Sequence, residues 1–236
     1  MNPAFFRFEL DLSVKDLQDD LKVCEDAEWK SHYNRQDYAG SWTSISLRSG
    51  SGKTDDIRAF PYETYADTPL LDKCPYFRWA IAWFECDKEA IRLLRLDPFS
   101  KIKEHNDRGA CYEEGDFRIH IPIITNEQVI FRVNKHLVPM KEGECWYANF
   151  DLPHSVENNS DTPRVHLVID CKRNEWSDGI FERAGFELSA IPDRRRMDNK
   201  TKRLVIDQLL RNPTETNVKL AAALREEVNA SGGADH

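Results

Sequence analysis

The chain has 236 residues, of which 40% are hydrophobic and 11% aromatic, and its formal net charge at pH 7 is -8. This composition provides enough apolar surface for one large domain with its own core. An acidic protein does not favour binding along a phosphate backbone, so we expect no nucleic-acid partner.

The first residues and the cysteines favour a cytoplasmic protein. The opening stretch MNPAFFRFELDL lacks the basic start and long apolar core of a signal peptide, and no stretch approaches the roughly 18 apolar residues of a membrane span. The six cysteines have no paired C-x-x-C spacing, which favours neither a zinc knuckle nor a disulfide framework. We therefore expect no membrane span and mostly buried, reduced thiols.

The amino-terminal third of the sequence predicts two helices and one strand. Apolar residues at helical spacing over 12–33 predict an amphipathic helix. The alternation of residues over 42–48 predicts a strand, and a second helix is expected after Pro75. One face of that second helix carries Phe77, Ile81 and Phe84.

Between residues 92 and 171 the pattern is almost wholly that of β-strands. Antiparallel strands in two packed sheets are the natural arrangement for such short runs. Pro122 lies inside one run and predicts either an edge strand or a β-bulge, because proline cannot donate to the ladder. The expected strands cover 92–96, 117–123, 129–133, 143–147 and 164–170.

After about residue 186 the sequence changes to charge runs and two short amphipathic patterns. The runs at 193–196 and 200–203 are typical of a solvated surface. Helices are expected around 204–210 and after Pro213. We therefore expect one domain over 1–185 and a helical extension over 186–236, which could cover a substrate mouth or mediate a homodimer.

The most informative pattern is His105-Asn106-Asp107, followed at a distance by His154 and Arg164. Two imidazoles and one carboxylate can occupy one face of an octahedral Fe(II) ion and leave three positions open. We call His105, Asp107 and His154 the metal triad. The guanidinium of Arg164 could hold the far carboxylate of a 2-oxo acid that chelates the same metal, because guanidinium pairs with carboxylate through two hydrogen bonds.

Strand periodicity places further polar side chains in pairs. Arg118 and His120 are two residues apart on one expected strand, and Arg164 and His166 on another, so each pair points to one side. If two sheets enclose a pocket, Arg118, His120 and Arg164 can line it, with the metal triad at its mouth. The alternative is that these polar faces meet water on an exposed side of a sheet.

A series of motifs follows the same order along the chain: YAGSW at 38–42, HND at 105–107, RIHIP at 118–122, EGECWYANF at 142–150 with PHSV at 153–156, and RVHL at 164–167. In order and spacing they resemble the aspartyl/asparaginyl β-hydroxylase family of Fe(II)- and 2-oxoglutarate-dependent oxygenases. The resemblance runs from about Tyr33 to Asp170.

The resemblance implies a mainly β fold with flanking helices, namely a double-stranded β-helix or cupin-like jelly roll. It implies Fe(II) at the metal triad, dioxygen as oxidant, 2-oxoglutarate bound by Arg164 with help from His120, and Arg118 facing the substrate. The best-known animal members lack the acidic metal ligand, whereas this chain keeps Asp107, as bacterial relatives and small-molecule proline hydroxylases do.

The expected activity is hydroxylation of an unactivated C–H bond in an amino acid, or in an aspartyl- or asparaginyl-type residue of a peptide or protein. A cupin-like metal-binding protein or a non-oxidative metalloenzyme could use the same barrel, because a fold does not fix a function. A non-enzymatic interaction module is a further alternative. Near the first expected strand, Arg35, Trp42 and Arg48 are candidates for the substrate side.

Overall fold

The structure is a computed structural model that describes residues 2–58, 64–191, 199–211, 213 and 215–231. Its contacts separate two units, Met1–Ala190 and Ile191–His236. The expected charge run at 193–196 lies outside the described residues.

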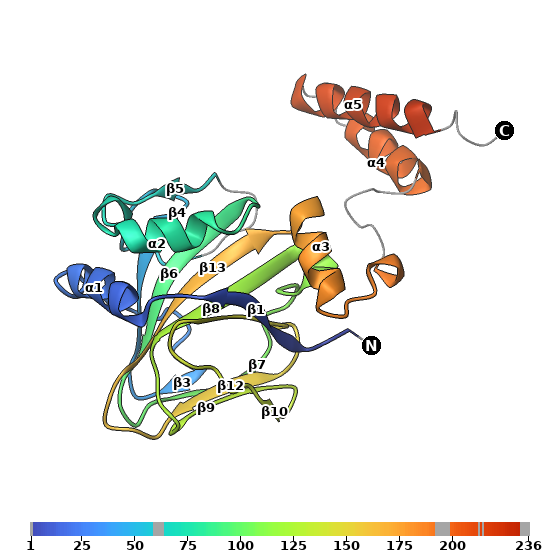
Figure 1. The fold of residues 1–236 in the computed structure, drawn as a ribbon. Helices are drawn as coiled ribbons and strands as arrows, with labels where there is room; N and C mark the ends of the chain where they lie inside the picture. Colours follow the sequence, from blue (N-terminus) through green and yellow to red (C-terminus); the bar gives the residue numbers. More distant parts are fainter. Residues whose placement is uncertain (1, 59–63, 192–198, 212, 214, 232–236) are drawn as a thin grey trace. The chain divides into compact units, whose positions relative to one another are not determined.

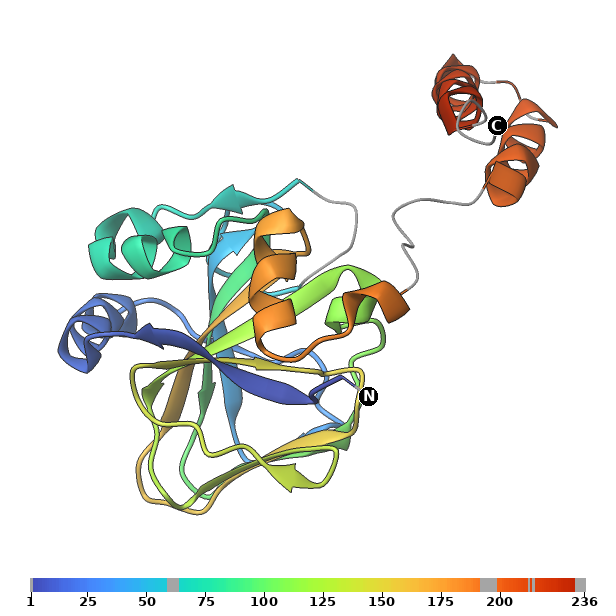
Figure 2. The ribbon, with the colours of Figure 1, turned by 45° about the vertical axis from the view of Figure 1, so that its right-hand side comes forward.

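The first unit is built on two antiparallel sheets that face each other (Figures 1 and 2). The larger sheet has the order β1 (Phe5–Asp11), β11 (Glu144–Ala148), β8 (Asp116–Ile124), β13 (Arg164–Lys172), β6 (Lys88–Leu96), β4 (Trp42–Ser49) and β2 (Lys30–Ser31), with β5 (Ala66–Asp67) paired to β4. The smaller sheet has the order β10 (His136–Leu137), β9 (Val129–Val133), β12 (His154–Asn158), β7 (Lys101–His105) and β3 (Tyr38–Ala39). This mainly β architecture confirms the expected jelly roll with flanking helices.

Helices cover the outer face of the larger sheet (Figure 2). They are α1 (Val14–Glu25), α2 (Pro75–Ala82) and α3 (Glu175–Arg183), with short 3-10 turns at Leu71–Lys73, Tyr112–Glu114 and Leu188–Ala190. The apolar residues expected on one face after Pro75 are buried, since Phe77 in α2 and Phe84 just beyond its end are fully buried and Ile81 is 8% exposed. An apolar cluster fills the space between the sheets, and it includes Trp42, Leu94, Leu96, Ile102, Phe131, Phe150 and Val168.

The expected helix over 12–33 is too long. Helix α1 begins after its cap Ser13, whose hydroxyl accepts from the amide of Asp16, and it ends at Glu25. Lys30 and Ser31 instead pair with β4 as strand β2. Pairing with a distant sheet edge therefore overrides the helical pattern there.

Strand β1 has no counterpart among the expected elements. It pairs with β11, and Phe8 is buried while the neighbouring Arg7 and Glu9 are exposed. That alternation was the available signal for a strand.

Pro122 lies in a central strand, because β8 pairs with both β11 and β13. The register between β8 and β13 shifts at Val165 and His166, next to the partner of Pro122. The bulge expected at Pro122 is confirmed, and the edge strand is wrong.

The second unit contains α4 (Asn199–Arg211) and α5 (Glu215–Ser231), which confirms the two expected helices. Ile206, Ala221 and Leu224 form its buried cluster. All six cysteines are free and all but the half-buried Cys86 are buried. Within the described part of the chain, no helix combines the length and apolarity needed to cross a membrane.

Gly143 provides a test of how β1 and β11 are joined. Its φ is +79°, and a Cβ there would lie 2.6 Å from the backbone oxygen of Leu12, whereas a Cβ on Gly115, at φ +95°, would meet nothing within 4 Å. Both alanine variants incur the left-handed backbone cost of about 1–2 kcal/mol. We expect Gly143→Ala to lower the free energy of unfolding by about 1 kcal/mol more than Gly115→Ala, measured by urea denaturation. Equal losses in the two variants would contradict the close approach.

Candidate functional site

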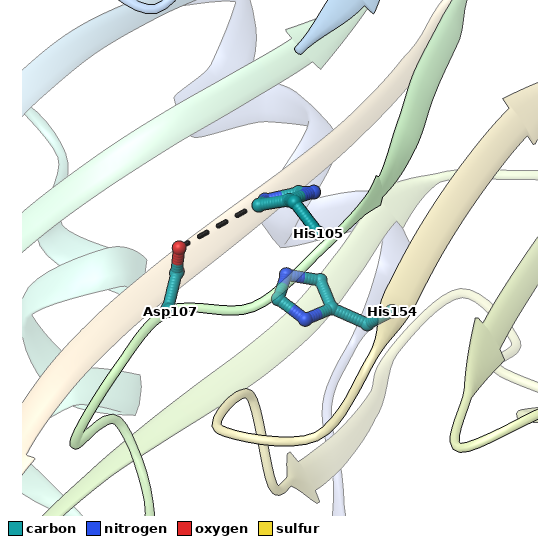
Figure 3. A group of neighbouring side chains, drawn as sticks. All are labelled: His105, Asp107 and His154. Atoms are coloured by element: carbon teal, nitrogen blue, oxygen red, sulfur yellow. Dashed lines mark ion pairs between the residues drawn. The ribbon is translucent and has the colours of Figure 1, made fainter.

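The three residues of the metal triad meet where β7 ends and β12 begins (Figure 3). His105 and His154 are direct partners in the β7–β12 ladder, and their ring centroids lie 4.2 Å apart. Asp107 follows two residues after His105, and its Oδ1 lies 3.8 Å from Nε2 of His105. One ligand atom from each residue lies within 4.8 Å of the other two.

Backbone carbonyls fix which nitrogen of each imidazole is free. Nδ1 of His105 lies 2.8 Å from the carbonyl oxygen of Lys103, and Nδ1 of His154 lies 3.0 Å from that of Leu152. Because a carbonyl only accepts, both Nδ1 atoms carry the proton and both Nε2 atoms keep a lone pair for a metal. Burial lowers the pKa of His154 to about 4, so this ring is neutral and able to bind a metal at pH 7.

Asp107 is held so that one carboxylate oxygen is engaged and the other is not. Its amide donates to the carbonyl of Phe150 at 2.9 Å, and its Oδ2 accepts from Nη1 of Arg118 at 2.7 Å. Burial acts to raise the pKa of Asp107, but the charge of Arg118 and its hydrogen bond to the carboxylate outweigh this effect, and the pKa is lowered. The carboxylate is therefore ionised, with Oδ1 available beside the two imidazoles.

Arg118 is shared between two carboxylates. Its Nε donates to Oδ1 of Asp170 at 2.6 Å, while Asp170 Oδ2 accepts from Nη2 of Arg92 at 2.5 Å. Asp107, Arg118, Asp170 and Arg92 thus form a continuous network with balanced charge. Arg118 lies beside the metal triad, and its contact with a substrate stays a prediction.

Arg164 presents the opposite situation, a buried cation without a counter-ion. Arg164 is 2% exposed, and no carboxylate of the described residues lies within ion-pair distance of its guanidinium. Burial lowers the pKa of Arg164 to about 9, and its Nε has no hydrogen-bond partner in the described part of the chain. An unpaired guanidinium inside a barrel is costly, so this position favours an anionic ligand.

All six residues singled out from the sequence line one cavity between the sheets. The polar faces of β8 and β13 therefore do not meet water on an exposed side. The roles of these side chains toward a metal, a cosubstrate or a substrate stay predictions. The cavity is lined by Trp42, Leu94, Ile102, His105, Asp107, Arg118, His120, Phe131, Phe150, His154, Val156 and Arg164.

Sequence reasoning missed several residues near this cavity. Asp170 could have been found, because it continues the inward alternation of β13. Arg92 is the ion-pair partner of Asp170 from β6. His32 carried no local signal, yet its ring stacks on Trp42 with centroids 3.6 Å apart. Among the residues that the structure describes, neither His32 Nδ1 nor Trp42 Nε1 has a hydrogen-bond partner. Of the other candidates on the substrate side, Arg48 pairs with Asp67 and does not line the cavity.

Comparison with known proteins gives one family. The family model described as aspartyl/asparaginyl beta-hydroxylase matches residues 12–174. A curated relative, the L-proline cis-4-hydroxylase of Rhizobium meliloti (strain 1021), is 32% identical over 169 residues, which cover 70% of this chain and 59% of the relative. The match thus spans less than two thirds of that relative's length.

Among solved structures, an oxidoreductase of the 2OG-Fe(II) oxygenase family from Burkholderia pseudomallei has a similar fold. The TM-score is 0.50 at 10% sequence identity, and the match covers 72% of this chain and 86% of that one. At this identity the likeness concerns the fold alone.

Replacing Arg164 tests whether its charge is uncompensated. Its folded-state pKa of about 9 lies below the ordinary value of 12.5, so at pH 7 the side chain is protonated in both the folded and the unfolded state, and the whole burial cost is present. We expect Arg164→Met to be no less stable than the wild type without ligands, with a gain of up to about 4 kcal/mol in urea denaturation at pH 7. The gain should shrink as the pH rises above 9.

The matched control is Arg132→Met, which removes an exposed arginine from β9. It should change the free energy of unfolding by less than about 0.5 kcal/mol. A large loss of stability in Arg164→Met would show that the guanidinium is compensated in the ligand-free protein.

Proposed function

Because the chain belongs to the aspartyl/asparaginyl beta-hydroxylase family, we propose that it is a 2-oxoglutarate-dependent dioxygenase that hydroxylates an unactivated C–H bond of a free amino acid. Membership of this family implies Fe(II), 2-oxoglutarate and dioxygen as metal, cosubstrate and oxidant. One observation carries the proposal: two imidazoles and a carboxylate converge in the same cavity as a buried guanidinium that has no counter-ion among the described residues.

The donor set fits Fe(II). His105 and His154 each offer an Nε2 lone pair and Asp107 offers Oδ1, a combination typical of non-haem Fe(II) sites that leave positions open. The carbonyls of Lys103 and Leu152 orient the imidazoles before any metal arrives. Bound Fe(II) would supply the activation of dioxygen, which no side chain of the cavity can provide.

The chemistry of the side chains that line the cavity also suits a dicarboxylic 2-oxo acid. Arg164 projects from the larger sheet and would pair with the far carboxylate, while the metal triad lies on the smaller sheet and its connection. Apolar walls between them would suit a methylene chain and exclude water. These walls are formed by Leu94, Ile102, Phe131 and Val156.

The choice of a free amino acid rests on the curated relative, whose name gives L-proline as its substrate. Arg118 is the side chain that would meet a substrate carboxylate beside the metal, since its guanidinium lies next to Asp107 in the cavity. An aspartyl or asparaginyl residue in a peptide is the second candidate, which the family description favours.

The direct test is turnover of the purified protein with Fe(II), 2-oxoglutarate and air. We expect succinate to form together with a free amino acid that gains one oxygen atom, detected by mass spectrometry, with free proline included in the panel. His154→Ala should abolish both products, since it removes a metal ligand. His136→Ala, which removes an exposed histidine of the same sheet, should leave them unchanged.

The substrate panel distinguishes the proposed function from its alternatives. If succinate forms and only aspartyl or asparaginyl peptides are hydroxylated, the substrate is a peptide and not a free amino acid. Metal binding without any consumption of 2-oxoglutarate would favour a cupin-like binding protein or a non-oxidative metalloenzyme instead.

Arg164→Met also tests the cosubstrate site. The variant should bind 2-oxoglutarate at least about 100-fold more weakly, because a charge-assisted bidentate contact is lost, while its Kd for Co(II) changes little. Calorimetry with the Co(II)-loaded protein measures both. Undiminished 2-oxoglutarate affinity would rule out Arg164 as the carboxylate partner.

A further inference from the structure

His166 lies deep in the barrel beside the two residues expected to hold the cosubstrate. Arg164, His166 and Val168 alternate on the inner side of β13, and His166 is 1% exposed. On the adjacent strand β8, His120 is the partner of Val168, which places His120 and His166 next to each other across the ladder. Their ring centroids lie 5.5 Å apart.

Two contacts converge on one nitrogen of His166. Nη2 of Arg164 lies 2.8 Å from His166 Nδ1, and Nδ1 of His120 lies 3.3 Å from the same atom. A guanidinium only donates, so His166 Nδ1 must be the acceptor and must lack a proton. His120 Nδ1 then must donate to it.

These contacts fix both tautomers, because both rings are neutral. Burial lowers the pKa of His120 and of His166 well below the ordinary value. In the neutral state His166 therefore carries its proton on Nε2, whereas His120 carries its proton on Nδ1 and exposes a lone pair at Nε2.

One further polar atom of each of these three residues has no partner among the described residues. Arg164 Nε, His120 Nε2 and His166 Nε2 are all buried and without hydrogen bonds in the described part of the protein. Buried polar atoms normally find partners, so this wall of the cavity is incomplete without a ligand.

We propose that His166 is a positioning residue of the cosubstrate site: its Nδ1 anchors the Arg164 guanidinium and sets the tautomer of His120. The inference rests on the proposed function, since it assigns Arg164 to a 2-oxo dicarboxylate. His166 acts through Arg164, because the contact to Nδ1 limits the rotation of the guanidinium. The same nitrogen accepts from Nδ1 of His120 and holds that ring in place.

Three substitutions separate this role from simple packing. His166→Asn keeps an acceptor oxygen near the position of Nδ1, whereas His166→Gln places its amide near the position of Nε2 and lacks the Nδ1 acceptor. His166→Leu removes both. The readout is the Kd for 2-oxoglutarate of the Co(II)-loaded protein, with the Kd for Co(II) itself measured in parallel.

We expect the Asn variant to bind 2-oxoglutarate within about threefold of the wild type, and the Gln and Leu variants to bind it at least about tenfold more weakly, with Co(II) affinity preserved in all three. Wild-type affinity in the Leu variant would overturn the proposal. Equal weakening in the Asn and Leu variants would also overturn it, because the Nδ1 acceptor would then not be the group that matters.

The tautomer of His120 gives a readout that packing alone would not move. In the Zn(II)-loaded wild type, ¹⁵N NMR of the imidazoles should show His120 protonated at Nδ1, with assignment from His120→Gln. In His166→Leu that pattern should change, because the acceptor has gone. An unchanged His120 pattern would contradict the proposal.

Failure of this inference is distinguishable from failure of the proposed function. If the wild-type metal form binds no 2-oxoglutarate, the cosubstrate assignment itself fails and the inference fails with it. If the wild type binds it and the Gln and Leu variants bind it equally well, only the role of His166 fails.

Discussion

The pairing of β7 with β12 is the constraint on which the site depends. His105 and His154 are 49 positions apart in sequence, and only the register of this ladder makes them direct partners. A slip of one residue would turn every side chain of a strand to the opposite face. The register of β12 is fixed on both sides, because His154 also pairs with Val133 of β9. Asp107 joins through its own backbone bond to Phe150.

Charge is arranged in two contrasting ways around the cavity. Near the metal triad, Arg118 and Arg92 are matched by Asp107 and Asp170, so that part of the site is neutralised and rigid before any ligand binds. At Arg164 the protein leaves a cation without a carboxylate, which costs free energy in the ligand-free state. This contrast separates the place where we propose that a metal binds from the place where we propose that an anion binds.

The polar interior depends on the outer face of the larger sheet. Along β13, Val165, Leu167 and Ile169 are at most 2% exposed and alternate with the inward Arg164, His166 and Val168. Apolar burial on the helix-covered side supplies stability that the polar side does not. Without the helices on its outer face, the larger sheet would lose this apolar burial. The polar atoms on its inner face would then weaken the fold.

The sequence by itself determined the strand runs of β4, β6, β8, β9, β11 and β13 and the alternation of polar side chains on β8 and β13, because these are local patterns of period two. It also suggested the metal triad, whose role as metal ligands stays a prediction. It could not give the end of α1 at Glu25, the choice of a bulge over an edge at Pro122, or the stacking of His32 on Trp42. Those features depend on which distant strand lies alongside, and no local pattern encodes a partner. Only the tertiary structure decided that Asp170 pairs with Arg118 while Arg164 has no carboxylate partner among the described residues, since the difference lies in neighbours far away along the chain.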